Sequence, residues 1–114
     1  MAAKKHPALS AAQLAGVARL FAVLSEPSRL VLLQALHAGP LTVNEMVEAS
    51  GLKQANVSKQ LAILHDSHLV RRERDGNSIR YEIADPMVFS LCNLVCSKMV
   101  RDAQCAMAMF HPEI

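Results

Sequence analysis

Amide, hydroxyl and ammonium side chains are concentrated in one short segment near the middle of this 114-residue chain. They belong to Gln54, Asn56, Ser58, Lys59 and Gln60. The amides of Gln54 and Asn56 can each form two hydrogen bonds with the edge of an adenine. Ser58 and Gln60 can bond to a base edge or to a phosphate. The lysine suits a phosphate contact. This combination of residues predicts contact with double-stranded DNA.

A second group of polar side chains follows further along the chain. Arg72 and Arg74 are two positions apart, so a β-strand would place them on one face, where they suit phosphate or minor-groove contact. The segment Asp75-Gly76-Asn77-Ser78 is typical of a turn between two strands. Asn77, in this turn, joins the predicted DNA contacts. Because the sequence does not fix which strand residues face which side, Arg71 remains an alternative to Arg72.

The three cysteines, Cys92, Cys96 and Cys105, all fall in one predicted helix near the end of the chain. At about 100° per residue, Cys96 lies about 40° from Cys92 around that helix, and Cys105 about 220°. Cys105 is also about 13 Å from Cys96 along the helix axis. One straight helix therefore cannot direct all three thiols at one ion. Cys92 and Cys96 can still supply two soft ligands for a metal or metalloid, with Met99 on the same face.

Packing is the alternative role for these cysteines, because free cysteine behaves as a small buried hydrophobe. An apolar stripe runs along the same predicted helix, and we interpret it as a dimer seam. The stripe is formed by Val88, Cys92, Val95, Cys96, Met99, Ala103, Ala106 and Phe110. Cys105 lies on the more polar face, one turn after Arg101, and is expected to be the most readily oxidised thiol.

Several classes of protein do not fit this composition. An odd number of cysteines in a chain without a recognisable signal peptide favours a reducing cytoplasm over a disulfide-bonded scaffold. No run of apolar residues approaches the roughly 20 needed to span a bilayer, so no membrane partner is expected. The sequence has no Gly-rich phosphate loop, no nucleophile motif and no paired carboxylates at catalytic spacing. We therefore do not expect an enzyme.

Positive charge is concentrated where the predicted DNA contacts lie. Residues 53–80 carry six lysines and arginines against three acidic residues, whereas residues 81–114 carry two against four. The formal net charge of the whole chain is only +2. The uneven distribution favours an anionic partner at the middle segment.

Five helices and one hairpin must position these side chains. Capping boxes at Ser10 with Gln13 and at Thr42 with Glu45 indicate two of the helix starts. The predicted helices cover about 11–24, 27–38, 43–50, 53–67 and 86–109, and the hairpin strands cover about 69–74 and 79–84. The predicted fold is α+β, mainly α: a winged helix-turn-helix whose fourth helix enters the major groove and whose hairpin is the wing. We expect a single DNA-binding domain over 1–114, with an ordered core at 9–110 and flexible ends at about 1–8 and 111–114.

Several dispersed segments resemble the ArsR/SmtB family of winged-helix repressors. They are Leu24-Ser25-Glu26-Pro27-Ser28-Arg29-Leu30, Val57-Ser58-Lys59-Gln60-Leu61, Leu64-His65-Asp66-Ser67-His68-Leu69-Val70 and Arg80-Tyr81. The resemblance implies a homodimer built on the first and last helices, bound to an operator with approximate two-fold symmetry and released by an inducer. Lys53 and Gln60 depart from the family pattern, which affects the expected operator sequence. The competing hypothesis is a winged-helix protein-interaction module without sequence-specific DNA binding.

The sensor sites that the resemblance implies are not present in this sequence. A Cys-x-Cys site on the third helix corresponds here to Thr42 and Asn44. A site on the last helix corresponds to Asp85-Pro86-Met87 with Lys98 and Arg101, where cations replace ligands. A cysteine pair using the second helix is excluded because no cysteine precedes Cys92. The open alternatives are a thiol-reactive species or soft metal at the last-helix cysteines, an apolar ligand at the dimer seam, and no inducer.

Overall fold

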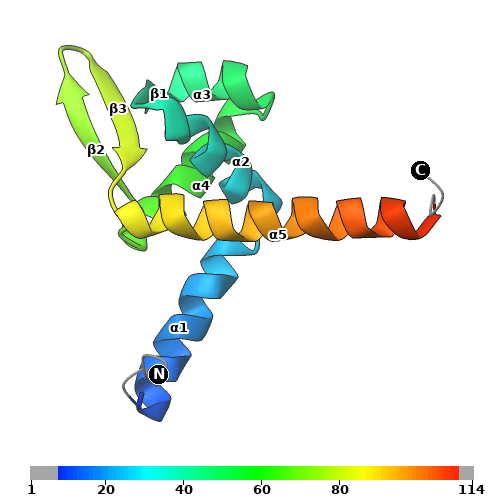
Figure 1. Ribbon diagram of the computed structural model, residues 1–114. Helices are drawn as coiled ribbons and strands as arrows, with labels where there is room; N and C mark the ends of the chain where they lie inside the picture. Colours follow the sequence, from blue (N-terminus) through cyan, green and yellow to red (C-terminus); the bar gives the residue numbers. More distant parts are fainter. Residues whose placement is uncertain (1–7, 111–114) are drawn as a thin grey trace.

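Five α-helices and a three-stranded antiparallel sheet form this chain in a computed structural model that describes residues 8–110 (Figure 1). The helices are α1 (Ala11–Leu24), α2 (Pro27–Ala35), α3 (Val43–Ser50), α4 (Gln54–Asp66) and α5 (Pro86–Phe110). The 3₁₀ turn η1 (Leu36–Ala38) extends α2, and the strands are β1 (Leu41–Thr42), β2 (Val70–Asp75) and β3 (Ser78–Ile83). The predicted helices and hairpin are confirmed. The expectations for residues 1–7 and 111–114 lie outside the described residues.

Local capping explains where the helices start. Both predicted capping boxes form: the Gln13 N–H donates to Ser10 Oγ at 3.1 Å, and the Glu45 N–H donates to Thr42 Oγ1 at 3.2 Å. Gly51 ends α3 with a φ of 73°, a conformation that glycine adopts without strain. Helix α4 follows Lys53 without a side-chain cap. Backbone N–H groups at such a helix start favour an anion.

The sheet has the order β1-β3-β2, so β3 pairs with both other strands. In the hairpin, Arg72 is opposite Tyr81 and Arg74 is opposite Ile79. Gly76 has a φ of 64° at the first of the two loop positions, where a type II′ turn favours glycine. Strand β1 was absent from the sequence prediction because a two-residue strand is too short to leave an alternating pattern.

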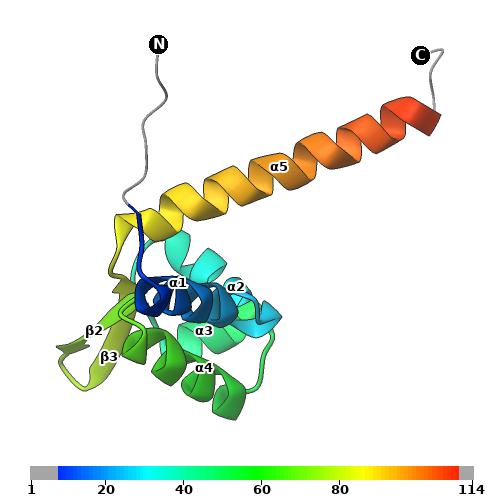
Figure 2. The same cartoon turned by 90° about the horizontal axis from the view of Figure 1, so that it is seen from below.

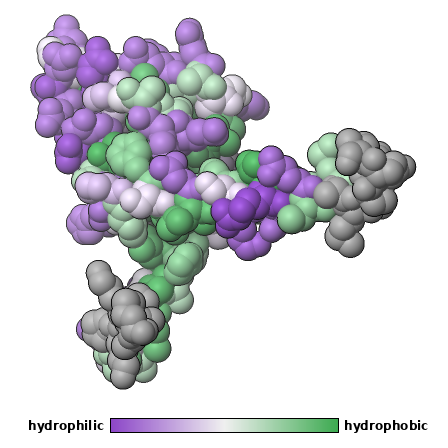
Figure 3. Space-filling view, viewed as in Figure 1, coloured by the Kyte–Doolittle hydropathy of each residue, from purple (hydrophilic) through white to green (hydrophobic). Residues whose placement is uncertain are grey.

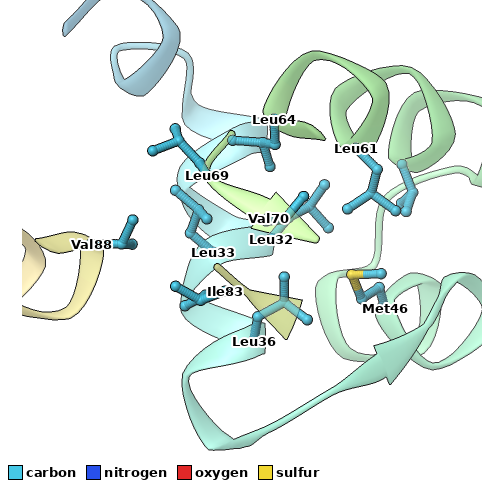
Figure 4. Packing of buried hydrophobic residues seen from close by; sticks show 11 residues of the cluster. Leu32, Leu33, Leu36, Met46, Leu61, Leu64, Leu69, Val70, Ile83 and Val88 are labelled. Carbon is cyan, nitrogen blue, oxygen red and sulfur yellow. The ribbon is translucent and has the colours of Figure 1, made fainter. Parts of the chain in front are cut away.

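The hydrophobic core lies between α2, α4 and the base of the hairpin (Figure 4). Helix α4 contributes three of its fully buried side chains, so one side of α4 is fixed to the core and the other side faces solvent. Among the α5 side chains that the structure describes, only Val88 is buried in this core, and Cys92 packs against it. The buried apolar residues are Leu32, Leu33, Leu36, Met46, Val57, Leu61, Leu64, Leu69, Val70, Ile83 and Val88.

Helices α1 and α5 extend away from this core in different directions (Figures 1 and 2). The radius of gyration is 17.8 Å, whereas a compact domain of this length would have about 13 Å. No residue of α1 is buried. Among the described residues, no helix is long and apolar enough to cross a membrane. The end of α1 and the start of α5 pack against the core, whereas the outer parts of both helices are exposed.

Candidate nucleic-acid interface

The solvent-facing side of α4 carries three of the predicted contact residues. Gln54, Ser58 and Lys59 are exposed. Within the part of the chain that the structure describes, their side chains are not engaged in hydrogen bonds with other residues. The opposite side of α4 is held by Val57, Leu61 and Leu64, each 0% exposed. A rigidly anchored helix with free polar groups on its outer side can enter a groove of a nucleic acid without unfolding.

Gln60 is a correction to the sequence prediction. Its side chain is on the buried side of α4 and only 6% exposed. Gln60 Oε1 accepts a hydrogen bond from Arg29 Nη1 at 2.8 Å, and Gln60 Nε2 donates to Asn56 Oδ1 at 2.9 Å. Both ends of the amide are thus occupied inside the protein. Gln60 is therefore unavailable for contact with a base in this conformation.

Asn56 is half-buried and connects this group to α2. Its Nδ2 lies 3.5 Å from Ser28 Oγ, near the upper limit for a hydrogen bond. Arg29 also donates from Nε to the Val23 carbonyl at the end of α1, at 2.6 Å. Ser28 and Arg29 entered the sequence prediction only as part of a family resemblance. In the sequence, Arg29 precedes the apolar Leu32 and Leu33 by three and four residues, so it lies on the same side of a helix as they do. A charged residue in this position is the signal that could have indicated an internal partner such as Gln60.

The arginines of the hairpin differ in whether they form ion pairs. Arg71 donates to Glu82 at 2.6 Å, and Arg80 donates to Asp75 at 3.1 Å. Arg72 and Arg74 are exposed and share one face of β2, the face that includes the buried Val70 at the base of the hairpin.

Among the described residues, no carboxylate is within ion-pair distance of Arg72 or Arg74. These two side chains therefore carry positive charge that no carboxylate of the hairpin compensates. Asn77 is exposed at the tip of the same hairpin. Together with the outer side of α4, the hairpin presents polar and basic groups that suit a phosphate backbone.

The cysteines have unequal environments. Cys92 packs partly against the core, while Cys96 and Cys105 are exposed. Burial raises the pKa of the Cys92 thiol above its ordinary value, and the neighbouring Cys96 adds to this effect. Within the described residues, no three His, Cys, Asp or Glu side chains come together in a way that could hold a metal ion. One protomer therefore offers at most the two thiols of Cys92 and Cys96 at one place.

Apolar side chains are exposed along α1 (Figure 3), and further large apolar side chains are exposed on α5. Leu14 and Phe21 of α1 are 54% and 59% exposed, and Val95 and Met99 of α5 are 52% and 63% exposed. Large contiguous apolar patches on a soluble chain mark interaction sites. Of the seam residues predicted from sequence, Val88 is a correction, because it is 1% exposed and belongs to the protomer's own core.

A polar helix face beside a basic two-stranded wing defines the winged helix-turn-helix class of protein. Comparison with known families places the chain within that class. The sequence profile described as "Bacterial regulatory protein, arsR family" matches residues 26–72. The chain belongs to the ArsR family of bacterial transcriptional regulators, a family of regulators and not of enzymes.

Three similar proteins illustrate the relationship. A probable mercury resistance operon repressor from Streptomyces lividans is 43% identical over 77 residues, 68% of this chain and 62% of the relative. The crystal structure of the AntR antimony-specific transcriptional repressor has a TM-score of 0.77 and 35% identity, covering 89% of this chain and 92% of that one. A homodimeric winged helix-turn-helix DNA-binding domain from Mycobacterium bovis has a TM-score of 0.70 and 33% identity, covering 82% of this chain and 85% of that one.

The chain covers a smaller share of the curated relatives than of the similar solved structures. The chain spans 62% and 64% of the length of the first two curated relatives that it matches. The matching solved structures are covered more fully, and they agree in the winged-helix fold. Two of the similar proteins are named for mercury and antimony, which are soft metal or metalloid elements.

Proposed function

We propose that this chain acts as a homodimeric repressor that binds operator DNA with α4 and the hairpin. The observation that carries the proposal is that Arg72 and Arg74 are exposed on β2, a strand that contacts α4, and have no carboxylate partner in the described chain. In this proposal Gln54 and Ser58 contact base edges, while Lys59, Arg72, Arg74 and Asn77 contact the phosphate backbone. Family membership supports the same function.

The exposed apolar surface on α1 and α5 supports the homodimer. A second copy would cover residues such as Phe21 and Met99, which are more than half exposed in one protomer. The similar domain from Mycobacterium bovis is homodimeric. A two-fold dimer carries two α4 helices, which would contact two half-sites about one helical turn of DNA apart. An operator with approximate two-fold symmetry follows from this arrangement.

Salt dependence of DNA binding tests the proposal. Each phosphate contact adds about 0.9 to the slope of log Kd against log salt. A dimer of the Arg72→Ala/Arg74→Ala variant loses four arginines, so its slope should fall by about 3 to 4 if each arginine meets one phosphate. The measurement is fluorescence anisotropy with a duplex from the DNA upstream of its own gene, at several salt concentrations.

Arg71→Ala is the matched control for this experiment. This substitution removes an arginine from the same strand, but one whose side chain is already paired with Glu82 at 2.6 Å. We expect a much smaller change of slope in this control. An unchanged slope in the double variant would contradict the assigned wing contacts. Weak, salt-independent binding by the natural chain would favour a protein-interaction module instead.

We further propose that Cys92 and Cys96 bind a soft metal or metalloid inducer in the dimer. The two thiols are one helical turn apart, and the relatives named for mercury and antimony support this class of ion. Since one protomer offers only two thiols, a third ligand would come from the partner protomer or from a small thiol. The ion binds thiolates, so binding should tighten as pH rises, and the raised pKa of Cys92 extends this tightening to higher pH.

Release from DNA tests the cysteine proposal. We expect arsenite or cadmium to raise the operator Kd of the reduced protein about 10-fold or more. The Cys92→Ser/Cys96→Ser variant should bind DNA normally and lose this response, whereas Cys105→Ser should keep it. A mild oxidant, tested in parallel, distinguishes thiol oxidation from ion binding.

Two outcomes would contradict the cysteine proposal. One is an undiminished response in the Cys92→Ser/Cys96→Ser variant, and the other is the absence of any response in the natural chain. In either case Cys92 and Cys96 would be packing residues of the seam. An apolar ligand at the seam would then be the next inducer to test.

A further inference from the structure

A series of hydrogen bonds connects the end of α1 with Gln60 and Asn56 of α4. It begins at Arg29, whose Nε donates to the Val23 carbonyl at 2.6 Å and whose Nη1 donates to Gln60 Oε1 at 2.8 Å. It continues from Gln60 Nε2 to Asn56 Oδ1 at 2.9 Å. No buried side-chain nitrogen or oxygen of the described residues lacks a partner.

Arg29 determines which group donates and which accepts in each of these hydrogen bonds. A guanidinium has five donors and no acceptor, so the atom of Gln60 that faces Arg29 must be the oxygen. Gln60 then presents its NH₂ group to Asn56, and Asn56 must in turn present its oxygen. The remaining Nδ2 group of Asn56 faces Ser28 Oγ at 3.5 Å. One fixed cation thus determines the orientation of two neutral amides.

This orientation removes Asn56 from base recognition. A bidentate contact with adenine needs the oxygen and the nitrogen of one amide at the same base edge. In this structure Asn56 Oδ1 accepts from Gln60, and Asn56 Nδ2 faces Ser28. Gln54, one helical turn earlier than Ser58, has neither restriction and is exposed.

We propose that Gln60, oriented by Arg29, holds the Asn56 amide against the protein, so that Gln54 and Ser58 read bases and Asn56 does not. This inference rests on the proposed DNA binding and assigns sequence specificity within it. It also gives Gln60 a positioning role in place of the predicted direct contact. Its consequence is that breaking the hydrogen bond to Asn56 changes which base is preferred, and not only how tightly DNA is bound.

Two substitutions of Gln60 separate these effects. Gln60→Met keeps the size and the helix but cannot bond to Asn56, so the Asn56 amide becomes free to face DNA. Gln60→Glu keeps an acceptor for Arg29, and its carboxylate can accept from Asn56 Nδ2 after the amide rotates. The added charge of Gln60→Glu should weaken binding to all sequences alike and leave base preference unchanged.

The experiment selects binding sites from a random duplex pool with the full chain and each variant. We expect Gln60→Met to gain a preference for adenine of about five-fold or more at one base pair, the lower end of what a bidentate contact provides. This preference should disappear in Gln60→Met/Asn56→Ala. Gln54→Ala should lose about five-fold or more at its own base pair, while Asn56→Ala changes no preference by more than about two-fold.

Each outcome supports or overturns the proposal. The proposal would be overturned if the single variant Asn56→Ala lost a base preference. An unchanged base preference in Gln60→Met would also overturn it. If Gln60→Met does not fold by circular dichroism, the comparison of Gln54→Ala with Asn56→Ala decides without it. A natural chain that enriches no sequence at all would overturn the proposed function itself, together with the reading assigned to Gln54.

Discussion

The double variant Phe21→Glu/Met99→Glu is expected to be monomeric and to bind operator DNA at least about 100-fold more weakly than the natural chain. Phe21 and Met99 are 59% and 63% exposed on the two extended helices. Covering them by a second copy would remove apolar area from water, and a glutamate at each position would bring desolvated carboxylates into that surface. A monomer also loses the gain in affinity that two linked half-site contacts provide.

Analytical ultracentrifugation and DNA titration measure the two effects. Leu94→Glu is the matched control, because Leu94 is 69% exposed on α5 but lies about 140° from Met99 around the helix. It should remain dimeric and bind DNA normally. A double variant that stays dimeric, or a control that dissociates, would show that a different surface forms the dimer.

The helix boundaries were predictable because local interactions set them. Ser10 and Thr42 form their capping boxes with residues three positions away, and Gly51 ends α3 through its own conformation. The predicted start of α4 at Lys53 and its end at Ser67 each differ by one residue from the observed Gln54–Asp66. These features depend on a few neighbouring residues, so a single sequence contains the information.

The orientation of Gln60 shows a different limit. Gln60 follows Val57 by three residues and precedes Leu64 by four, so helical periodicity alone places it on the buried side. The sequence prediction nevertheless assigned its amide to a DNA contact. The internal partner, Arg29, is 31 residues away in the sequence, so it could not be identified from the neighbouring residues. A polar residue on a buried helix face requires a distant partner, and such a partner is identified only when the fold is known.

The arginines of the hairpin illustrate how register completes a sequence pattern. Alternation suggested that Arg72 and Arg74 share a face, but the choice between Arg71 and Arg72 depended on the pairing of β2 with β3. The register places Arg71 opposite Glu82, its ion-pair partner, and Arg72 opposite Tyr81. The sequence alone could not distinguish these arginines because all are basic and close together.

Leu61→Ala is expected to lower the free energy of unfolding by about 2–5 kcal/mol, the range for truncating a fully buried leucine. Leu61 is 0% exposed and belongs to the side of α4 that packs into the core. The loss combines the transfer free energy of the removed atoms with the cavity that remains. Urea unfolding followed by circular dichroism measures it, at one fixed protein concentration because dimerisation makes stability concentration-dependent.

Ile79→Ala provides the control, because Ile79 is 40% exposed on the hairpin and should cost well under half as much. A small domain has only about 5–15 kcal/mol of stability, so Leu61→Ala consumes a large part of it. The fraction of protein able to bind DNA should fall near the unfolding temperature, while the salt slope of the folded fraction stays unchanged. A loss below about 1 kcal/mol in Leu61→Ala would contradict the role of the core in fixing α4. Equal losses in both variants would do the same, since the position of Gln54 and Ser58 depends on that fixed helix.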